Sequence, residues 1–485
     1  MSEAWNRVAG RVPTGLLIGG EWVAGSAGVL EVEDPSTAEA FVEVAAGDES
    51  DMLAAVAAAH DAGPAWAATS PRDRAEVLRR AYEAMIEQVD EIATVMVLEN
   101  GKAYTDAVGE VRYAAEFLRW FSELAAHVHG QSGRAPAGDK RILTNRRPVG
   151  VALMVTPWNF PAAMATRKIG PALAAGCTVV LKPAKLTPLT ANYVGRLLVE
   201  AGVPDGVVNI VTTASAGAPV AAALADDRVR KLSFTGSTEV GRILLEQAAR
   251  RVVNCSMELG GNAPLVVFDD ADIDLAVAGA MVAKMRNAGE ACTAANRIYV
   301  HEAVAGAFTE ELTAAMAAQK VGPGLAEGVE VGPLVDQATR DKVEELVASA
   351  VDAGGTIRTG GNRVGERGWF YAPTVISGVE AGSPILGEEI FGPVAPIVTF
   401  TSDDEAVAAA NDTPFGLAAY VFTGDLARGL NIAERIEAGM VGVNRGLMSD
   451  PAAPFGGLKQ SGLAREGGTE GLDAYLETQY IAADW

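Results

Sequence analysis

The stretch Val149-Gly-Val-Ala-Leu-Met-Val155 marks the point where the sequence takes on the pattern that decides the fold. This apolar run predicts a buried strand, and the residues from Ala162 to Ala175 predict a helix after it. Strand and helix patterns then alternate as far as Arg250, with short glycine-rich connections between them. Such alternation is typical of a parallel sheet with helices on both faces. We therefore predict an α/β protein whose ligand binds at the carboxyl ends of the strands.

The same alternation begins again after Glu258-Leu-Gly-Gly261. Leu265 to Phe268 predicts a strand, Ala271 to Arg286 has the apolar spacing of a helix, and Arg297 to Val300 predicts another strand. This restart predicts a second α/β domain that begins near residue 260.

The residues before Val149 have a different pattern, with three predicted helices. We expect Gly63-Pro64 to end the first helix, and we expect Ser70-Pro71 to begin a second one that ends near Asn100-Gly101. Beyond the helices, Arg141 to Thr144 predicts an isolated strand, and Ala474 to Ala483 at the other end of the chain predicts an edge strand.

Length and charge limit the function. The chain has 485 residues, enough for two to four domains at roughly 100–200 residues each. Its net charge of −23 argues against a nucleic acid or an anionic membrane as a partner, because both attract basic patches. No apolar run approaches the roughly 18 residues of a spanning helix, and the N-terminus does not resemble a secretory signal. We therefore expect no nucleic-acid or membrane partner.

Cysteine and histidine usage bears on the compartment and on metal binding. The three cysteines, Cys177, Cys255 and Cys292, do not predict a disulfide framework, so a reducing cytoplasm is the simplest location. Cys177 and Cys255 have small and apolar neighbours, which is typical of buried strand cysteines. The four histidines are too few and too scattered for an obvious metal site, and we expect none.

Cys292 differs from the other two cysteines, because the stretch Asn287-Ala-Gly-Glu-Ala-Cys292 consists of small and polar residues after an amphipathic run. A thiol in such a loop can be partly open to solvent, and it is a good nucleophile as the thiolate. If it attacks a carbonyl group, the reaction needs a donor for the oxyanion, a base for a water molecule and an acceptor for two electrons.

Two segments at predicted strand ends are candidates for a cofactor site. Phe234-Thr-Gly236-Ser237 follows a strand and begins a helix, where backbone N–H groups suit a phosphate. The alternative is a plain glycine turn before a capped helix, since the G-x-G-x-x-G fingerprint is missing. Lys182 and Lys185 follow the predicted strand that ends at Leu181, and they can reach a ribose or its phosphate, or can be a solvated strand end.

The donor and the base also have candidates. Asn159, between Pro157 and Pro161, lies in a stiff loop after a strand and can direct its amide N–H groups at an oxyanion, although an asparagine often only completes a turn. Glu258 lies at the boundary of the two α/β units, where burial would raise its pKa toward that of a useful base. Glu290 competes for the same role, and spacing does not exclude it.

Together, five motifs in register resemble the NAD(P)-dependent aldehyde dehydrogenase superfamily over nearly the whole chain: Pro157-Trp-Asn-Phe-Pro161, Phe234-Thr-Gly-Ser-Thr238, Glu258-Leu-Gly-Gly261, Gly289-Glu-Ala-Cys292 and Glu389-Ile-Phe-Gly-Pro393. Three longer blocks most resemble succinate-semialdehyde dehydrogenases: Ala163-Met-Ala-Thr-Arg-Lys168, Lys284-Met-Arg-Asn-Ala-Gly289 and Ala453-Pro-Phe-Gly-Gly457.

The resemblance implies a role for each matching residue. Cys292 is the nucleophile, the Asn159 amide and the Cys292 N–H hold the oxyanion, and Glu258 activates water to hydrolyse the thioester. The positions that match cofactor-binding residues are Trp158, Lys182, Lys185, Gly236, Ser237, Leu259, Glu389 and Phe391. Arg167, Arg286 and Ser449 match residues that bind the distal carboxylate of a semialdehyde. An arginine fork suits a carboxylate, although either arginine can instead belong to a structural ion pair.

The implied reaction is the oxidation of succinate semialdehyde to succinate with NAD(P)+. Glutarate semialdehyde, or another aldehyde of the superfamily, is the alternative, because one methylene group changes binding by only about 1–3 kcal/mol. Lys185 replaces the glutamate of NAD-preferring members, which favours NADP over NAD. Ala294 replaces a second cysteine found in close relatives. A CoA-acylating relative is disfavoured by Glu258, and a non-catalytic protein by the retained catalytic residues.

The resemblance also implies a three-part subunit. We expect a Rossmann-type cofactor domain at residues 1–125 and 149–259 and an α/β catalytic domain at residues 260–459. A small β flap for oligomerisation, with the tail, would comprise residues 126–148 and 460–485. The family is oligomeric, so we expect a homodimer or a homotetramer.

Overall fold

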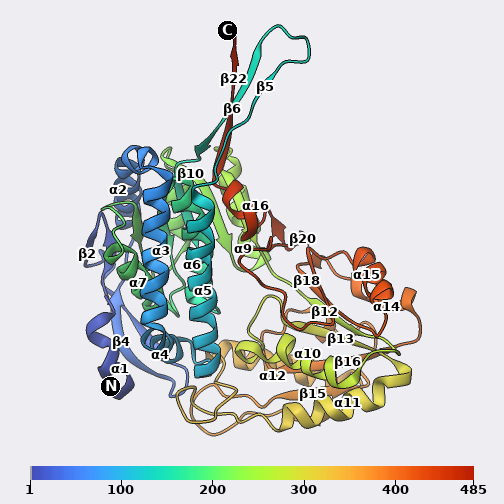
Figure 1. Cartoon of the computed structure of the whole chain (residues 1–485). Helices are drawn as coiled ribbons and strands as arrows, with labels where there is room; N and C mark the ends of the chain where they lie inside the picture. Colours follow the sequence, from blue (N-terminus) through green and yellow to red (C-terminus); the bar gives the residue numbers. More distant parts are fainter. Residues whose placement is uncertain (1–2, 485) are drawn as a thin grey trace.

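The computed structural model describes residues 3–484 and has two α/β units side by side, with a narrow flap extending from one end (Figure 1). The first unit contains an eight-stranded sheet. Its strands, in spatial order, are β2 (Glu21–Val23), β1 (Leu16–Ile18), β9 (Val208–Ile210), β8 (Thr178–Lys182), β7 (Val151–Val155), β10 (Val229–Thr235), β11 (Asn254–Glu258) and β21 (Gly462–Leu463). The five strands from β9 to β11 are parallel, as the alternating pattern predicted.

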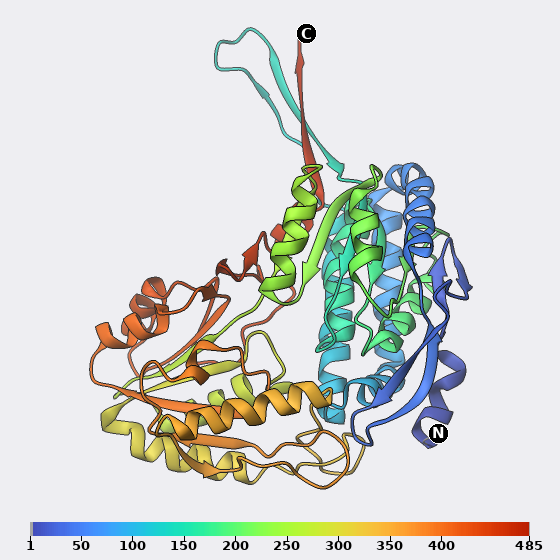
Figure 2. The same cartoon turned by 180° about the vertical axis from the view of Figure 1, so that it is seen from behind.

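Helices cover both faces of this sheet, because successive side chains of each strand enter different cores. Along β7, Ala152 and Met154 pack under α3 (Pro71–Glu87), α4 (Val89–Asn100), α5 (Tyr104–Ala125), α6 (Pro161–Ala175) and α7 (Pro188–Glu200). Val151, Leu153 and Val155 pack on the opposite side, under α2 (Glu49–Ala68), α8 (Gly217–Ala225) and α9 (Thr238–Ala249). Figure 2 shows α8 and α9, in green, on that second face.

The second unit contains a seven-stranded sheet with its own core. Its strands, in spatial order, are β14 (Thr356–Thr359), β15 (Thr374–Ser377), β16 (Val394–Phe400), β13 (Ala295–His301), β12 (Ala263–Val267), β18 (Ala418–Phe422) and β19 (Met440–Val443). Every neighbouring pair in this sheet is parallel except β14 with β15. The helices are α10 (Ile273–Met285), α11 (Glu302–Ala317), α12 (Gln337–Asp352), α13 (Pro384–Gly387), α14 (Asp403–Asn411) and α15 (Leu426–Arg435).

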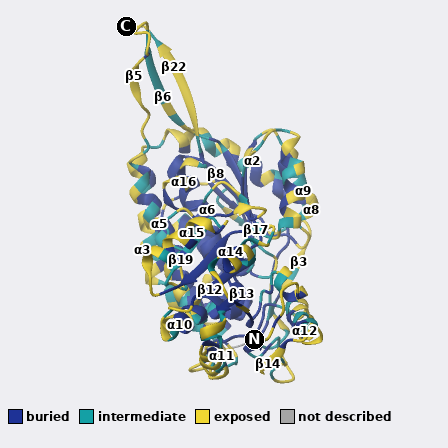
Figure 3. Cartoon of the chain, turned by 90° about the vertical axis from the view of Figure 1, so that its right-hand side faces the viewer, coloured by how far each residue is buried: buried dark blue, intermediate teal, exposed yellow. Residues whose placement is uncertain are grey.

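The flap is a three-stranded antiparallel sheet of β5 (Ser132–Arg134), β6 (Arg141–Pro148) and β22 (Leu476–Ala483). Its strands are mostly exposed or intermediate, in contrast to the buried strands of the two large sheets (Figure 3). Residues 460–475 lie elsewhere: β21 pairs with β11, and α16 (Gly468–Asp473) packs on α5 and α6. Of the predicted tail, residues 460–485, the final strand β22 alone joins the flap sheet, and the domain boundaries stay a prediction.

Smaller elements complete the chain. The N-terminal part holds α1 (Glu3–Val8), a short 3₁₀ helix (Ala9–Arg11) and the hairpin of β3 (Val29–Asp34) with β4 (Glu39–Ala45). A two-stranded pairing of β17 (Phe415–Gly416) with β20 (Leu458–Lys459) lies near the junction of the two units.

Two expectations about the N-terminal helices were wrong in detail. The helix α2 continues through Gly63-Pro64 to Ala68, because Pro64 lies on its exposed side while Trp66, one turn from the end, is buried at 2% exposure. The predicted second helix is divided at Gln88 into α3 and α4. Its ends are as predicted, since the Ser70 hydroxyl caps the first turn and Gly101 takes a left-handed conformation after the last.

Two glycines give a matched test of these helix assignments. Gly101 has a φ of +93°, and a Cβ there would lie 2.8 Å from Pro333 Cγ, so Gly101→Ala should lower the free energy of unfolding by roughly 1–3 kcal/mol. Gly109 lies inside α5 with open space around it, so Gly109→Ala should raise that free energy by roughly 0.5–1 kcal/mol. Urea unfolding of both variants measures the two changes in the free energy of unfolding. Two changes of the same sign would contradict the placement of Gly101 after a helix end and of Gly109 inside a helix.

Candidate functional site

A cleft of about 520 Å³ lies at the carboxyl ends of β7, β8, β10 and β11, between the two units. Asn159 and Cys292 line it from opposite units. Every residue that the sequence predicted to bind a cofactor also lines it: Trp158, Lys182, Lys185, Gly236, Ser237, Leu259, Glu389 and Phe391. The cleft is therefore at the edge of the sheet where parallel strands bind ligands.

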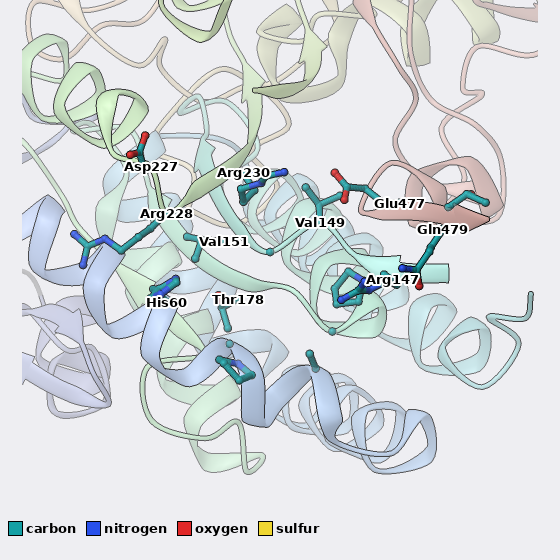
Figure 4. Close-up of a pocket in the computed structure, with 17 residues that line it drawn as sticks. His60, Arg147, Val149, Val151, Thr178, Asp227, Arg228, Arg230, Glu477 and Gln479 are labelled. Atoms are coloured by element: carbon teal, nitrogen blue, oxygen red, sulfur yellow. The ribbon is translucent and has the colours of Figure 1, made fainter. Parts of the chain in front are cut away.

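A second hollow of similar volume, about 530 Å³, lies at the opposite edge of the same sheet (Figure 4). It is lined by residues at the amino ends of strands, among them Val151 and Thr178, and by flap residues such as Arg147 and Glu477. None of the predicted site residues lines it. The chemistry is therefore assigned to the first cleft.

The loop before Cys292 has an unusual backbone. Asn287 and Ala288 both have a φ of +52° and Gly289 has one of +80°, so the chain turns sharply after α10. Such conformations are costly for residues with a Cβ and persist where the surroundings hold them. Here the Asp106 carboxylate accepts the Asn287 N–H at 2.8 Å, and the Asn287 side chain donates to the Glu290 carbonyl at 3.2 Å.

This turn places Cys292 half-buried in the cleft. Burial raises the pKa of its thiol to about 12, although the positive charges of Arg167 and Arg286 act to lower it. In the ligand-free protein the thiol is therefore protonated at neutral pH. A nucleophilic attack by Cys292 requires a base that removes its proton.

Asn159 is fixed by hydrogen bonds to its backbone carbonyl and by one from its side chain to the cysteine loop. The backbone carbonyl of Asn159 accepts from Lys102 Nζ at 2.7 Å and from Asn287 Nδ2 at 2.9 Å. Its amide Nδ2 donates to the Glu290 carbonyl at 3.0 Å. An amide nitrogen carries two hydrogens, so one N–H remains for a ligand in the cleft.

A buried ion pair supports this loop from behind, and the sequence analysis missed it. Lys102 Nζ lies 2.5 Å from Glu110 Oε2, and both side chains are almost fully buried. The other Glu110 oxygen accepts the N–H groups of Ala162 and Ala163, at the first turn of α6. No local pattern marks this pair, because its partners are residues that only the tertiary fold brings together.

The two candidate bases have different surroundings. Glu258 ends β11, is 2% exposed, and neither carboxylate oxygen has a hydrogen-bond partner among residues 3–484. Burial raises its pKa well above the ordinary value, and the negative charge of Glu466 raises it further. Glu290 accepts the Val335 N–H at 3.0 Å, so one of its oxygens is already bound to the second unit. Glu258 is therefore the better-placed base.

Glu466, a second residue missed by the sequence analysis, connects Glu258 to the distal side of the site. Its carboxylate contacts the Lys168 ammonium, and Arg167 Nε lies 2.6 Å from its Oε2. The pKa of Glu466 stays below its ordinary value, although burial acts to raise it, because Lys168 and Arg167 stabilise the carboxylate. The structure therefore places Arg167 in an ion pair, which was one of the alternatives left open by the sequence.

The three residues predicted to bind a distal carboxylate meet around Tyr113. Burial raises the pKa of the Tyr113 phenol, while Arg167, Arg286 and Ser449 beside it act to lower that pKa. The Arg286 guanidinium lies over the Phe160 ring, 4.9 Å from its centroid. Among residues 3–484, no carboxylate pairs with Arg286, so its charge is available to a ligand.

The opposite end of the cleft suits a nucleotide with a phosphate. Lys182 is 7% exposed, and burial, together with the charge of Lys185, lowers its pKa to about 8. Lys185 is exposed, and no carboxylate pairs with either lysine in the described part of the chain. The Ser237 hydroxyl caps α9 by accepting the Val240 N–H at 3.3 Å, next to Gly236. Unpaired cations beside a helix start form an anion site.

The end of the cleft nearer to Cys292 is more enclosed. Burial raises the pKa of Glu389 to about 7, and its carboxylate accepts the Gly261 N–H at 3.2 Å. The rings of Trp158 and Phe391 meet edge to face with centroids 5.8 Å apart. Aromatic rings and a carboxylate that line one cleft are side chains of the kind that contact a nicotinamide and a ribose, so the residues present suit a nicotinamide dinucleotide.

Two further features were considered for residues 3–484 of the fold, a membrane-spanning helix and a cluster of metal ligands. No helix there is long and apolar enough to cross a membrane. No group of three or more histidine, cysteine, aspartate or glutamate side chains there could hold a metal ion.

The chain is similar to known proteins over nearly its whole length. The model of the aldehyde dehydrogenase family matches residues 22–481. A succinate-semialdehyde dehydrogenase of Paenarthrobacter nicotinovorans is 53% identical over 90% of this chain and 97% of its own length. The NADP(+) succinate-semialdehyde dehydrogenase of Escherichia coli K12 and a glutarate-semialdehyde dehydrogenase of Pseudomonas putida KT2440 are each 46% identical, with 96% of each chain covered. The solved structure of an NADP-dependent enzyme from E. coli has a TM-score of 0.97 at 45% identity, covering 98% of this chain and 99% of the other.

The Lys102–Glu110 pair is open to a direct test. Lys102→Met leaves the Glu110 carboxylate buried without its cation, so it should lower the free energy of unfolding by roughly 3–5 kcal/mol. The double variant Lys102→Met/Glu110→Gln should lose less than the sum of the single variants, because no lone charge remains. Urea unfolding measures the cycle. Arg79→Met, which breaks exposed ion pairs, is the control, and it should change the free energy of unfolding little. If the losses of the two single variants at Lys102 and Glu110 were additive in the double variant, the pair would not be coupled.

Proposed function

This chain belongs to the aldehyde dehydrogenase family, and we propose that it oxidises succinate semialdehyde to succinate with NADP+. The family resemblance and the α/β fold predicted from the sequence are confirmed by the family match and by the solved relatives. The observation that carries the substrate is the unpaired Arg286 guanidinium, which lies near both Cys292 and the Tyr113 hydroxyl. A substrate with an aldehyde at one end and a carboxylate at the other can reach both groups.

The reaction begins at Cys292. Glu258 is near enough for its charge to act on the Cys292 thiol and, in the proposed mechanism, takes the thiol proton, which matches a base whose pKa is raised by burial. The thiolate attacks the aldehyde carbon and forms a thiohemiacetal. The free N–H of the Asn159 amide and the backbone N–H of Cys292 would donate to the oxyanion. NADP+, when bound, supplies the acceptor for the hydride that leaves this carbon.

Loss of the hydride leaves a thioester on Cys292, which water must hydrolyse. Glu258 would first release the thiol proton to solvent, and the regenerated carboxylate would then take a proton from that water, so the same side chain serves both steps. Its two oxygens without hydrogen-bond partners support this role, because they are available to water. The Lys102–Glu110 pair would keep the Asn159 loop in place throughout, since it binds the Asn159 carbonyl and the first turn of α6.

Glutarate semialdehyde is the second candidate substrate. A relative with that printed function is as similar to this chain as the E. coli succinate-semialdehyde enzyme. Both substrates carry a distal carboxylate and would use the same arginines, and they differ by one methylene group.

The preference for NADP is proposed on the basis of Lys185. Its exposed ammonium, beside the buried Lys182, would attract the additional phosphate that distinguishes NADP from NAD. We also propose a homodimer or a homotetramer, with the exposed flap as part of the contact. A cytoplasmic location is supported by the three free cysteines, since a reducing compartment keeps thiols unpaired.

Arg286→Ala tests the substrate. It should lower kcat/KM for succinate semialdehyde roughly tenfold to over a hundredfold, because a hydrogen-bonded charge contact is lost. Its kcat/KM for butyraldehyde, the uncharged analogue, should stay near that of the wild type. Steady-state NADPH formation measures both, and Arg230→Ala, an exposed arginine in the opposite hollow, is the control. If Arg286→Ala treats both aldehydes as the wild type does, the substrate proposal fails and a general aldehyde dehydrogenase remains.

Lys185→Glu tests the cofactor. Replacing the cation by an anion should shift the ratio of kcat/KM for NADP+ to that for NAD+ toward NAD+ by roughly tenfold or more. Lys320→Glu makes the same charge change on an exposed lysine of the second unit and should leave the ratio unchanged. An unchanged ratio in Lys185→Glu would separate Lys185 from the recognition of the phosphate.

A further inference from the structure

The two arginines of the distal site differ in the charge that they can offer. Arg286 lies over a phenylalanine ring with no carboxylate partner among the described residues, whereas Arg167 is paired with Glu466. The Arg167 and Glu466 side chains are buried, with 2% and 6% exposed. A substrate carboxylate that approaches Arg167 therefore meets a guanidinium whose charge is already balanced.

The contact between Arg167 and Glu466 is close but poorly aligned. Arg167 Nε and Glu466 Oε2 lie 2.6 Å apart, yet neither atom forms a hydrogen bond of acceptable angle. The strongest arginine–carboxylate pairs are aligned, two-pronged contacts. The observed pair lacks that alignment, so another carboxylate can compete for the guanidinium.

Glu466 has a second cation that stays with it when Arg167 takes another partner. The Lys168 ammonium contacts the other carboxylate oxygen of Glu466 and also donates to Ser233 Oγ at 3.0 Å. A buried carboxylate without any cation would be strongly unfavourable. Because Lys168 remains, the exchange of partners at Arg167 leaves no such group.

Arg167 has supports that do not depend on the Glu466 side chain. Its guanidinium lies 4.1 Å from the centroid of the Phe455 ring, and Nη2 lies 3.0 Å from Met164 Sδ. Phe455 is in turn held by two backbone hydrogen bonds with Glu466, of 2.6 and 2.8 Å, which a change of that side chain would preserve. The guanidinium can therefore stay in place while its ionic partner changes.

We propose that Glu466 is a specificity-determining residue, the resident counter-ion of Arg167 that the distal carboxylate of the substrate displaces. This inference rests on the proposed function. In the empty site, Glu466 balances a buried guanidinium that cannot lose its proton. In the occupied site, Glu466 pairs with Lys168 alone.

The exchange has two consequences for the reaction. An aldehyde without a distal carboxylate does not displace Glu466, so it gains nothing from Arg167. The dicarboxylate product binds less tightly than it would to two arginines without carboxylate partners. The reason is that the Glu466 carboxylate competes with the product for Arg167. Selectivity is thus obtained without a site that retains its product.

The test measures succinate binding by titration calorimetry, with the full chain in the presence of NADP+. Glu466→Gln removes the competing charge, so it should bind succinate roughly three- to tenfold more tightly than the wild type. Glu466→Asp keeps the charge but withdraws it by one methylene group, and its gain should be smaller. Glu470→Gln, the same charge change on an exposed residue of α16, should bind as the wild type does.

A second variant locates the effect at Arg167. In an Arg167→Gln background, Glu466→Gln should bring no gain in succinate affinity, because the guanidinium for which it competes is missing. The inference would be overturned if Glu466→Gln bound succinate no more tightly than the wild type. It would also be overturned if Glu466→Gln raised the succinate affinity equally in the Arg167→Gln background. If Glu466→Gln does not fold, Glu466→Asp decides, and an affinity equal to or below that of the wild type counts against the exchange.

The same titrations separate this inference from the proposed function. If succinate did not bind the wild type, or bound Arg286→Ala as tightly as the wild type, the proposed carboxylate site itself would be contradicted. Succinate that binds the wild type, weakens in Arg286→Ala and is indifferent to Glu466→Gln would leave the proposed function standing and reject only the role of Glu466.

Discussion

The buried contact of Lys102 with Glu110 is the constraint on which the rest of the site depends. Neither charge can face water, so each must be satisfied by the groups around it. Lys102 does so by binding the Asn159 carbonyl, and Glu110 by binding two N–H groups at the first turn of α6. The helices α4 and α5, the oxyanion loop and α6 are therefore fixed relative to one another by one charge pair. The cysteine loop joins the same group through Asn287, which also binds the Asn159 carbonyl.

A second buried cluster sets the electrostatics. Arg167 and Lys168 bring two cations to the carboxylates of Glu258 and Glu466, so the cluster is balanced as a whole but not residue by residue. Both cations contact the Glu466 carboxylate directly, and the pKa of Glu466 is therefore lowered. Glu258 is left without a hydrogen-bond partner, and its pKa is raised. Two carboxylates in one site thus acquire different protonation behaviour from their positions alone, as an acid–base mechanism requires.

Local sequence patterns were enough for the parallel sheets and for the residues at strand ends. The carboxyl ends of strands gather at one edge, so Asn159, Lys182 and Gly236 could be expected in one cleft from their place after a strand. Pro64 failed as a helix stop because burial of Trp66 is a tertiary effect that a local rule does not contain. Lys102, Tyr113 and Glu466 were missed for the same reason. Their partners lie far away along the chain, and no spacing rule connects them.

The cleft also explains how a strongly acidic protein can accept an anionic substrate. Net charge acts at long range, where salt screens it over a Debye length of about 8–10 Å. Contacts inside a half-buried site are screened much less. The local cations are therefore decisive: Lys182 and Lys185 line the cleft, and the charge of Arg286 acts on Cys292 and Tyr113. In the proposed reaction, an anion held at each group of cations would bring the two reacting parts together at Cys292. The placement of a few unpaired cations, rather than the overall charge of −23, determines what this chain can bind.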